Sequence, residues 1–116
     1  RAGTFTATGT GFSVAPTALY EYTLNNKAVT LYMPTISNTA DATTAFTITG
    51  VPSHLRPSAT RTFGPLIVTD NNSYLYTGFM TLSTGGVFTL YTTAGGAGWT
   101  ASQPKALFAG NISYTL

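Results

Sequence analysis

Polar and apolar residues alternate with a period of two along most of the chain. Tyr20, Tyr22 and Leu24, for example, alternate with Glu21 and Thr23. Successive side chains of a strand point to opposite faces of a sheet, so this alternation predicts half-buried β-strands. No segment repeats apolar residues at helical spacing over three turns, and the pattern therefore predicts an all-β protein. The expected strands are Thr4–Thr8, Ala18–Leu24, Lys27–Met33, Ala45–Thr49, Arg61–Asp70, Tyr74–Leu82, Val87–Thr92 and Phe108–Leu116.

Two of these runs are separated by a short polar segment that predicts a tight hairpin. Asn25 and Asn26 lie between the runs, and Asn tolerates the positive φ that such a turn requires. In the second run Val29, Leu31 and Met33 fall on one face, which is expected to be the buried one.

Other polar segments predict further turns and loops. Asp70–Ser73 and Thr84–Gly86 are rich in turn-forming residues and should connect consecutive strands. Pro65 cannot donate to a ladder and predicts an edge or a bulge. The expected loops are Ser37–Thr44, Ser53–Ser58 and Ala94–Lys105.

One long alternating run contains two tyrosines. Tyr74, Tyr76, Gly78, Met80 and Leu82 share a face in a strictly alternating strand. We therefore expect Tyr76 to lie in the core or in a subunit interface.

The number and spacing of the strands indicate an architecture. About eight short strands with turn signals every ~8–12 residues are typical of an antiparallel β-sandwich or jelly roll. The length of 116 residues predicts a single domain, 1–116, and neither an internal repeat nor a heptad run is present. The chain begins without Met, which is typical of a fragment or a processed piece, and we expect it to be the C-terminal part of a longer protein.

The composition changes this picture in one respect, because few residues are charged. Only 7% of the residues are charged while 43% are hydrophobic, against about 25% charged in a typical soluble domain. A folded monomer would expose much neutral or apolar surface, which favours an oligomer. The net charge of +2 gives no electrostatic footprint for nucleic acid. No stretch reaches the ~20 apolar residues of a membrane helix.

The residues that usually carry catalysis are scarce. The chain has no Cys, a single His, and only Glu21, Asp41 and Asp70 as acids. These cannot readily supply a catalytic triad, a glycosidase carboxylate pair or a protein-only metal site. We therefore expect a non-catalytic protein without a metal or cofactor.

Binding residues are easier to identify, since Tyr, Trp, Asn and Thr suit the recognition of sugars. Trp99 lies in the Gly-rich loop, where it is expected either as an exposed aromatic platform or folded back onto the core. Asn71, Asn72 and Tyr74 form a second candidate patch, which is equally consistent with plain turn chemistry. The further candidates are His54 and Arg56, each of which also has a structural interpretation as part of an irregular loop.

The stretch from Tyr22 to Pro57 has a distinctive order of features: a Tyr-containing strand, a polar turn, a second strand, a polar loop, a short strand and a corner. In this chain they are Tyr22–Leu24, Asn25–Lys27, Ala28–Pro34, the Ser/Thr/Asn loop, Phe46–Thr49, and Gly50–Pro52 leading to Leu55–Pro57. With this order of features the stretch resembles the distal domains of bacteriophage tail fibres and related virion appendages.

The resemblance implies a homotrimeric β-sandwich at a fibre tip that attaches the virion to a bacterial surface receptor, often a polysaccharide. It implies a virion location and no catalytic residues. It would also account for the composition, because trimer packing covers apolar strand faces that a monomer would expose.

Two other readings fit the same sequence. One is a monomeric carbohydrate-binding module of a larger hydrolase, although a monomer usually carries more surface charge. The other is a purely structural virion component with the same fold and no ligand. The mass in solution and the binding of glycans distinguish the three.

Overall fold

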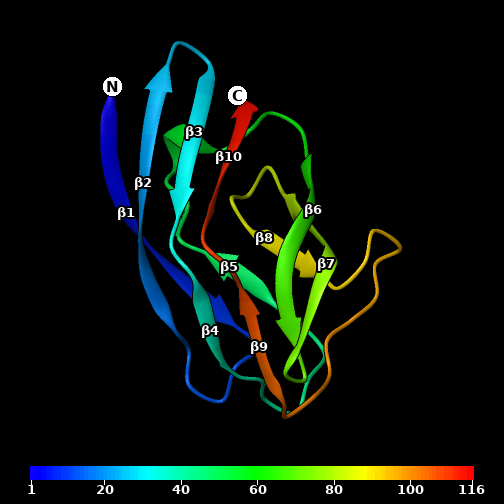
Figure 1. Cartoon of the computed structure of the whole chain (residues 1–116). Coiled ribbons are helices and arrows are strands. Elements are labelled where there is room, and N and C mark those ends of the chain that lie inside the picture. Colours follow the sequence, from blue (N-terminus) through cyan, green and yellow to red (C-terminus); the bar gives the residue numbers. More distant parts are fainter.

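The computed structural model describes all residues from Arg1 to Leu116, and its regular secondary structure consists almost entirely of antiparallel strands. Figure 1 shows them curled into a half-barrel, with both chain ends at the top of the view. The only helical segment is the short 3₁₀ turn η1, and no helix is long and apolar enough to cross a membrane. The elements are β1 (Ala2–Thr10), β2 (Thr17–Asn25), β3 (Ala28–Met33), β4 (Ile36–Thr39), β5 (Thr47–Thr49), η1 (Ser53–Leu55), β6 (Arg61–Asp70), β7 (Ser73–Leu82), β8 (Phe88–Tyr91), β9 (Pro104–Leu107) and β10 (Gly110–Thr115).

The strands form one ten-stranded sheet in the order β10-β3-β2-β1-β5-β8-β7-β6-β9-β4. The all-β prediction is confirmed, and each of the eight expected strands is present. The hairpin between β2 and β3 is also confirmed, with Asn25 opposite Ala28 and Asn26 at a φ of 57°. The positive φ suits Asn because its short polar side chain tolerates the left-handed region.

Two strands were not expected from the sequence, and they correct two predicted loops. β4 occupies the start of the segment expected as the loop 37–44, and β9 lies at the end of the loop 94–105. They pair with each other, so that Ile36 lies opposite Leu107 and Ser37 lies opposite Ala106. Each strand is short and mostly polar or mixed, so only this long-range pairing makes it a strand.

Two links of two residues each connect β4 and β9 to strands at the opposite end of the sheet order. Pro34 and Thr35 link β3 to β4, while Phe108 and Ala109 link β9 to β10. β10 pairs with β3 at one end of the sheet order, and β9 pairs with β4 at the other end. The links β3–β4 and β9–β10 therefore both run from one end of the sheet order to the other.

Apolar side chains of the inner faces form one core of 22 buried residues. Tyr20, Tyr22, Val29, Leu31 and Met33 all belong to it, as their alternation predicted. Aromatic rings contribute much of this core, and aromatic pairs with tilted or edge-on geometry stabilise such packing beyond the buried area alone.

The outer edge of β4 is covered by the segment that follows β1. The Ser13 backbone N–H donates to Thr39 O over 3.1 Å, and the Asn38 side-chain amide donates to Val14 O over 3.0 Å. An uncovered edge would offer unpaired backbone groups to other chains, so this segment protects the sheet from edge-to-edge association.

Candidate functional site

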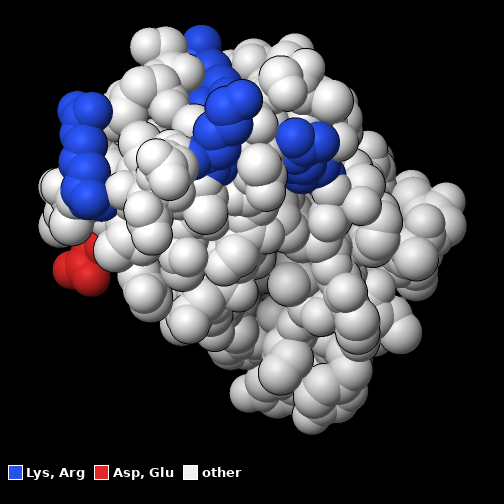
Figure 2. Space-filling view, turned by 90° about the horizontal axis from the view of Figure 1, so that it is seen from above, with Lys and Arg blue, Asp and Glu red and all other residues white.

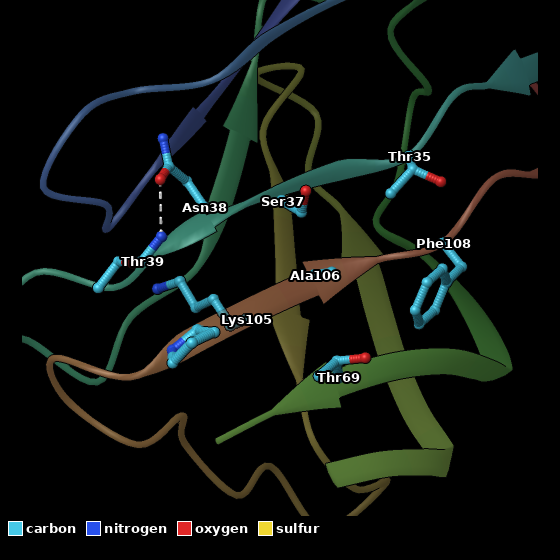
Figure 3. Close-up of a pocket in the computed structure, with 9 residues that line it drawn as sticks. Thr35, Ser37, Asn38, Thr39, Thr69, Lys105, Ala106 and Phe108 are labelled. Carbon is cyan, nitrogen blue, oxygen red and sulfur yellow. Dashed lines mark hydrogen bonds between the residues drawn. The ribbon is translucent and has the colours of Figure 1, made fainter. Parts of the chain in front are cut away.

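An open groove lies on the outer face of the sheet where β4, β9 and β6 run side by side. Figure 3 shows its lining side chains, and its volume is about 380 Å³. Ser37, Ala106 and Thr69 form one row across the three strands. Ala106 lies between two residues that carry hydroxyls, and its own side chain is only a methyl group. The middle of the groove is therefore formed by a small side chain, and its two sides are polar.

Further hydroxyl and backbone groups complete the groove. Thr35 lies at one end, where its Oγ1 accepts a hydrogen bond from the Ala109 backbone N–H over 3.0 Å. Thr39 lies toward the other end, and its backbone N–H donates to the Asn38 side-chain oxygen over 2.8 Å (Figure 3). The side chains of Ser37, Thr39 and Thr69 make no hydrogen bond through their hydroxyls within the protein, which leaves them free to bind a ligand.

Aromatic side chains lie beside these hydroxyl groups. The Phe108 ring lines the groove, and the Tyr74 ring stacks on it with a centroid separation of 5.5 Å and an interplanar angle of 18°. Tyr74 is 66% exposed. Ile67 and Tyr76 are exposed on the same outer face, at 48% and 68%. We call these three aromatic residues and the aliphatic Ile67, that is Phe108, Tyr74, Tyr76 and Ile67, the aromatic ridge.

A β-bulge turns the two tyrosines outward, so Tyr76 does not lie in the core, which was one of the two locations expected for it. Leu66 pairs with Gly78 and Val68 pairs with Leu75, so the register between β6 and β7 shifts between these pairs. The extra residue on β7 reverses which side chains face the core, as bulges do. Leu75 therefore packs toward the core while Tyr76 is exposed. The bulge that Pro65 predicted is confirmed in this region.

A second and larger hollow lies beyond Tyr76 on the outer face. Its volume is about 690 Å³, and its lining includes Pro65, Tyr76 and Phe79. The segment Thr93–Gly95 closes its far side. Tyr76 thus belongs both to the ridge and to the lining of this hollow.

The only cation near the groove is directed into the protein. Lys105 is 1% exposed, and its ammonium group donates to Gly11 O over 2.7 Å and to Ala45 O. It also lies 4.6 Å from the centroid of the Phe12 ring and 5.1 Å from that of Phe46. Burial lowers the pKa of Lys105 from its usual value. Its charge is thus held by carbonyls and rings, and the groove offers a ligand no free charge.

Trp99 is not an exposed platform, which corrects one of the two alternatives for this residue. It is 2% exposed, its indole N–H donates to Leu90 O over 2.9 Å, and its ring lies 5.1 Å from that of Phe46. A buried indole needs a partner for its N–H, and the carbonyl of β8 supplies one. The ring is folded back onto the core and presents no face to a ligand.

The patch of Asn71, Asn72 and Tyr74 lies at the border of the groove. Asn71 and Asn72 form the turn between β6 and β7 with φ of 51° and 62°, and both are exposed. The Asn71 backbone N–H donates over 2.9 Å to the carbonyl of Pro104, a residue that lines the groove. Asn71 and Asn72 therefore form the turn, and the patch also lies beside the groove.

His54 and Arg56 lie apart from the groove, in and after η1. The His54 Nε2 is 3.2 Å from the Tyr22 hydroxyl, and the Arg56 Nε–H donates to Val51 O over 3.0 Å. The structure brings these two residues close to each other but not to the other candidates.

Two of the three side-chain carboxylates, Asp41 and Asp70, accept hydrogen bonds within the protein. Asp41 accepts from the backbone N–H and the hydroxyl of Thr43, and these bonds lower the pKa of Asp41. Asp70 accepts from the backbone N–H and the hydroxyl of Thr100, each over 2.9 Å. No group of three or more His, Cys, Asp or Glu side chains comes together. The arrangement suits reversible binding through hydroxyls and aromatic faces.

Sequence reasoning missed Phe108, Ile67 and the hydroxyls of Ser37 and Thr69 as site residues. They come from β4, from β6 and from the link that follows β9, and nothing local in the sequence shows that these segments are neighbours. The one available signal was Pro65, because a bulge inverts the faces of the residues beyond it.

A scan of the sequence against protein-family models finds no match, and a search of curated proteins likewise finds none.

Proposed function

We propose that this chain is a non-catalytic receptor-binding domain that attaches a bacteriophage tail fibre, or a related virion appendage, to a polysaccharide of the bacterial surface. The observation that carries the binding part is the uncharged groove with free hydroxyls beside the stacked Tyr74 and Phe108 rings. The assignment to a virion rests on the resemblance of the stretch Tyr22–Pro57 to the distal domains of phage tail fibres.

The chemistry of the groove supports a neutral sugar as the ligand. A sugar ring has an apolar C–H side and a rim of hydroxyls. The exposed ring faces of the ridge offer apolar surface to the first, while Ser37 and Thr69 offer donors and acceptors to the second. A few placed polar groups beside aromatic surface are typical of small-molecule sites.

The expected assembly is part of the same proposal. We propose a homotrimer of domains with β-sandwich or jelly-roll packing, located at the tip of the appendage and outside the cell during attachment. The exposed apolar residues Leu19 and Tyr32, on the other half of the sheet, support an interface between copies.

Binding is tested with an array of bacterial surface polysaccharides, followed by calorimetric titration of the glycan that binds. Tyr74→Ala and Phe108→Ala should each weaken binding about tenfold or more, because central aromatic contacts dominate such interfaces. Thr84→Ala is the control, since Thr84 is exposed in the turn between β7 and β8 and lines neither the groove nor the larger hollow.

Unchanged affinity of both groove variants, with their fold intact by circular dichroism, would contradict the assignment of the site. No binding to any glycan would favour a structural virion component. Sedimentation equilibrium tests the assembly: a mass three times that of the 12.1 kDa chain supports the trimer, and a monomer favours a carbohydrate-binding module of a larger hydrolase.

A further inference from the structure

Four of the five cations of the chain gather at one end of the molecule although they are far apart in the sequence. They are Arg1, Lys27, Arg56 and Arg61, and Figure 2 shows the Lys and Arg side chains together in the view onto this end. We call this surface the cationic end. It is the end at which both chain termini emerge in Figure 1.

Strand pairing brings the first two cations together. Arg1 and Leu24 exchange backbone hydrogen bonds of 2.6 and 3.0 Å, which places Arg1 at the end of β2. Lys27 belongs to the turn that follows β2, and its carbonyl accepts from the Leu116 backbone N–H over 2.8 Å. The termini and the β2–β3 turn therefore share this end.

The other two cations are fixed beside the same strands. The Arg61 Nε–H donates to Thr115 O, at the end of β10, over 3.0 Å. Arg56 follows Leu55, whose carbonyl accepts from the hydroxyl of Tyr114 on β10 over 2.6 Å. The Nε–H of Arg56 donates to Val51 O. Each of the two guanidinium groups is therefore held by its own hydrogen bond to a backbone carbonyl.

This arrangement leaves the terminal nitrogens of both guanidiniums available. Neither makes a further hydrogen bond within the protein, and no carboxylate pairs with either. Asp41 and Asp70 are bonded to Thr43 and Thr100, and Glu21 makes no salt bridge. In Figure 2 acidic atoms lie beside the cations only at one border of this end. Positioned and unpaired guanidiniums suit carboxylate and phosphate groups, which they bind through two parallel N–H donors.

We propose that the cationic end binds a sparsely charged anionic polysaccharide through its carboxylate or phosphate groups. Four cations match a polymer with separated charges better than duplex DNA, which carries a charge every ~1.7 Å and usually meets six to ten phosphate contacts. The site is separate from the groove, so it does not depend on the neutral-sugar assignment there.

The test measures binding of the full chain to immobilised polymers by biolayer interferometry at about 0.02 M and about 0.3 M salt. The probes are polygalacturonate for carboxylates, teichoic acid for phosphates, dextran as a neutral glycan, and duplex DNA. We expect binding to one or both anionic glycopolymers at low salt, a strong decrease at high salt, and no salt-dependent binding to dextran.

Lys27→Gln and Arg61→Gln should each weaken this binding about fivefold, since each removes one cation near an anionic surface. Lys27→Arg keeps the charge and should bind like the wild type. Val14→Ala, at an exposed side chain that belongs neither to the groove lining nor to the cationic end, should not change it. Arg56 is left unaltered because it directly follows η1 and its Nε–H supports the Val51 corner. Arg61→Gln also loses the bond of its Nε–H to Thr115 O, so circular dichroism and thermal unfolding check that this variant keeps the fold.

Three results would overturn the inference. They are an absence of binding to both anionic glycopolymers at low salt, affinities unchanged in Lys27→Gln and Arg61→Gln, and tighter binding to DNA than to either glycopolymer. If instead the array reveals a neutral glycan for the groove while these probes fail, the proposed function stands and this inference alone is wrong.

Discussion

The hydroxyl of Tyr20 is the one buried side-chain polar atom that lacks a hydrogen-bond partner. Tyr20 is fully buried on β2, whereas the hydroxyl of the buried Tyr114 donates to Leu55 O over 2.6 Å. The same functional group is therefore unsatisfied at one position and satisfied at the other. Burying a polar group costs free energy unless a hydrogen bond compensates.

This difference predicts opposite effects of the same substitution. Tyr20→Phe should raise the free energy of unfolding by up to about 1 kcal/mol, because it removes an unpaired hydroxyl. Tyr114→Phe should lower it by about 1 kcal/mol, because it leaves the Leu55 carbonyl without its donor. Urea denaturation at neutral pH measures both. A loss of stability in Tyr20→Phe comparable to that in Tyr114→Phe would show that the Tyr20 hydroxyl has a partner.

At the scale of the elements, the bulge between β6 and β7 determines what the outer face displays. Gly78 lies where the backbones approach closely, and a Cβ there would lie 2.7 Å from Val68 Cγ1 and 2.8 Å from Leu66 O. The carbonyl belongs to the main chain of the neighbouring strand and cannot move without disturbing the ladder.

Gly78→Ala should therefore lower the free energy of unfolding by about 1–3 kcal/mol, the range typical of overpacking. It should also weaken glycan binding, because the ridge tyrosines depend on this register. Gly110→Ala is the matched control, since a Cβ at Gly110 meets nothing within 4 Å. Thermal unfolding and titration together are the measurements, and equal stability of the two variants would contradict the role of the bulge.

The elements also show which parts of the fold the sequence could predict. Strands β2 and β3 alternate strictly and meet at an Asn turn, so the local pattern defined their position and buried face. Ile36–Thr39 and Pro104–Leu107 lack such a pattern, and each became a strand only through its distant partner. The groove lies between these two strands, so sequence reasoning found its border at Asn71 and Tyr74 but not its floor.

Trp99 illustrates the same limit for a single residue. A Gly-rich loop is compatible with both an exposed and a buried ring, and the composition of the loop did not distinguish them. The Leu90 carbonyl decided the outcome, because it satisfies the indole N–H inside the core.

At the scale of the whole molecule, buried tyrosines link stability to alkaline pH. Burial raises the pKa of Tyr114 to about 12 and that of Tyr20 well above its usual value. An unfolded chain releases these protons near pH 10. Above that pH the native state binds more protons than the unfolded state, so the free energy of unfolding decreases as the pH rises.

Urea denaturation between about pH 10.5 and 12 should therefore show falling stability, by up to about 1.4 kcal/mol per pH unit for each tyrosine. Lys105, whose pKa is lowered, acts in the opposite direction only below the ~10.4 of an unfolded lysine. In Tyr114→Phe the decrease should be less steep. A slope identical to that of the wild type would mean that Tyr114 ionises normally in the folded protein.

The position of β10 has a consequence for how the chain reaches its fold. Ile112 lies opposite Leu31, so one of the last segments of the chain completes the ladder of one of the first. Pairings between such distant segments form slowly, because a long loop must close before any contact stabilises it. During synthesis, β3 therefore waits with an open edge until nearly the whole domain has left the ribosome. Protection of this edge by a chaperone or by neighbouring copies would matter most in that interval.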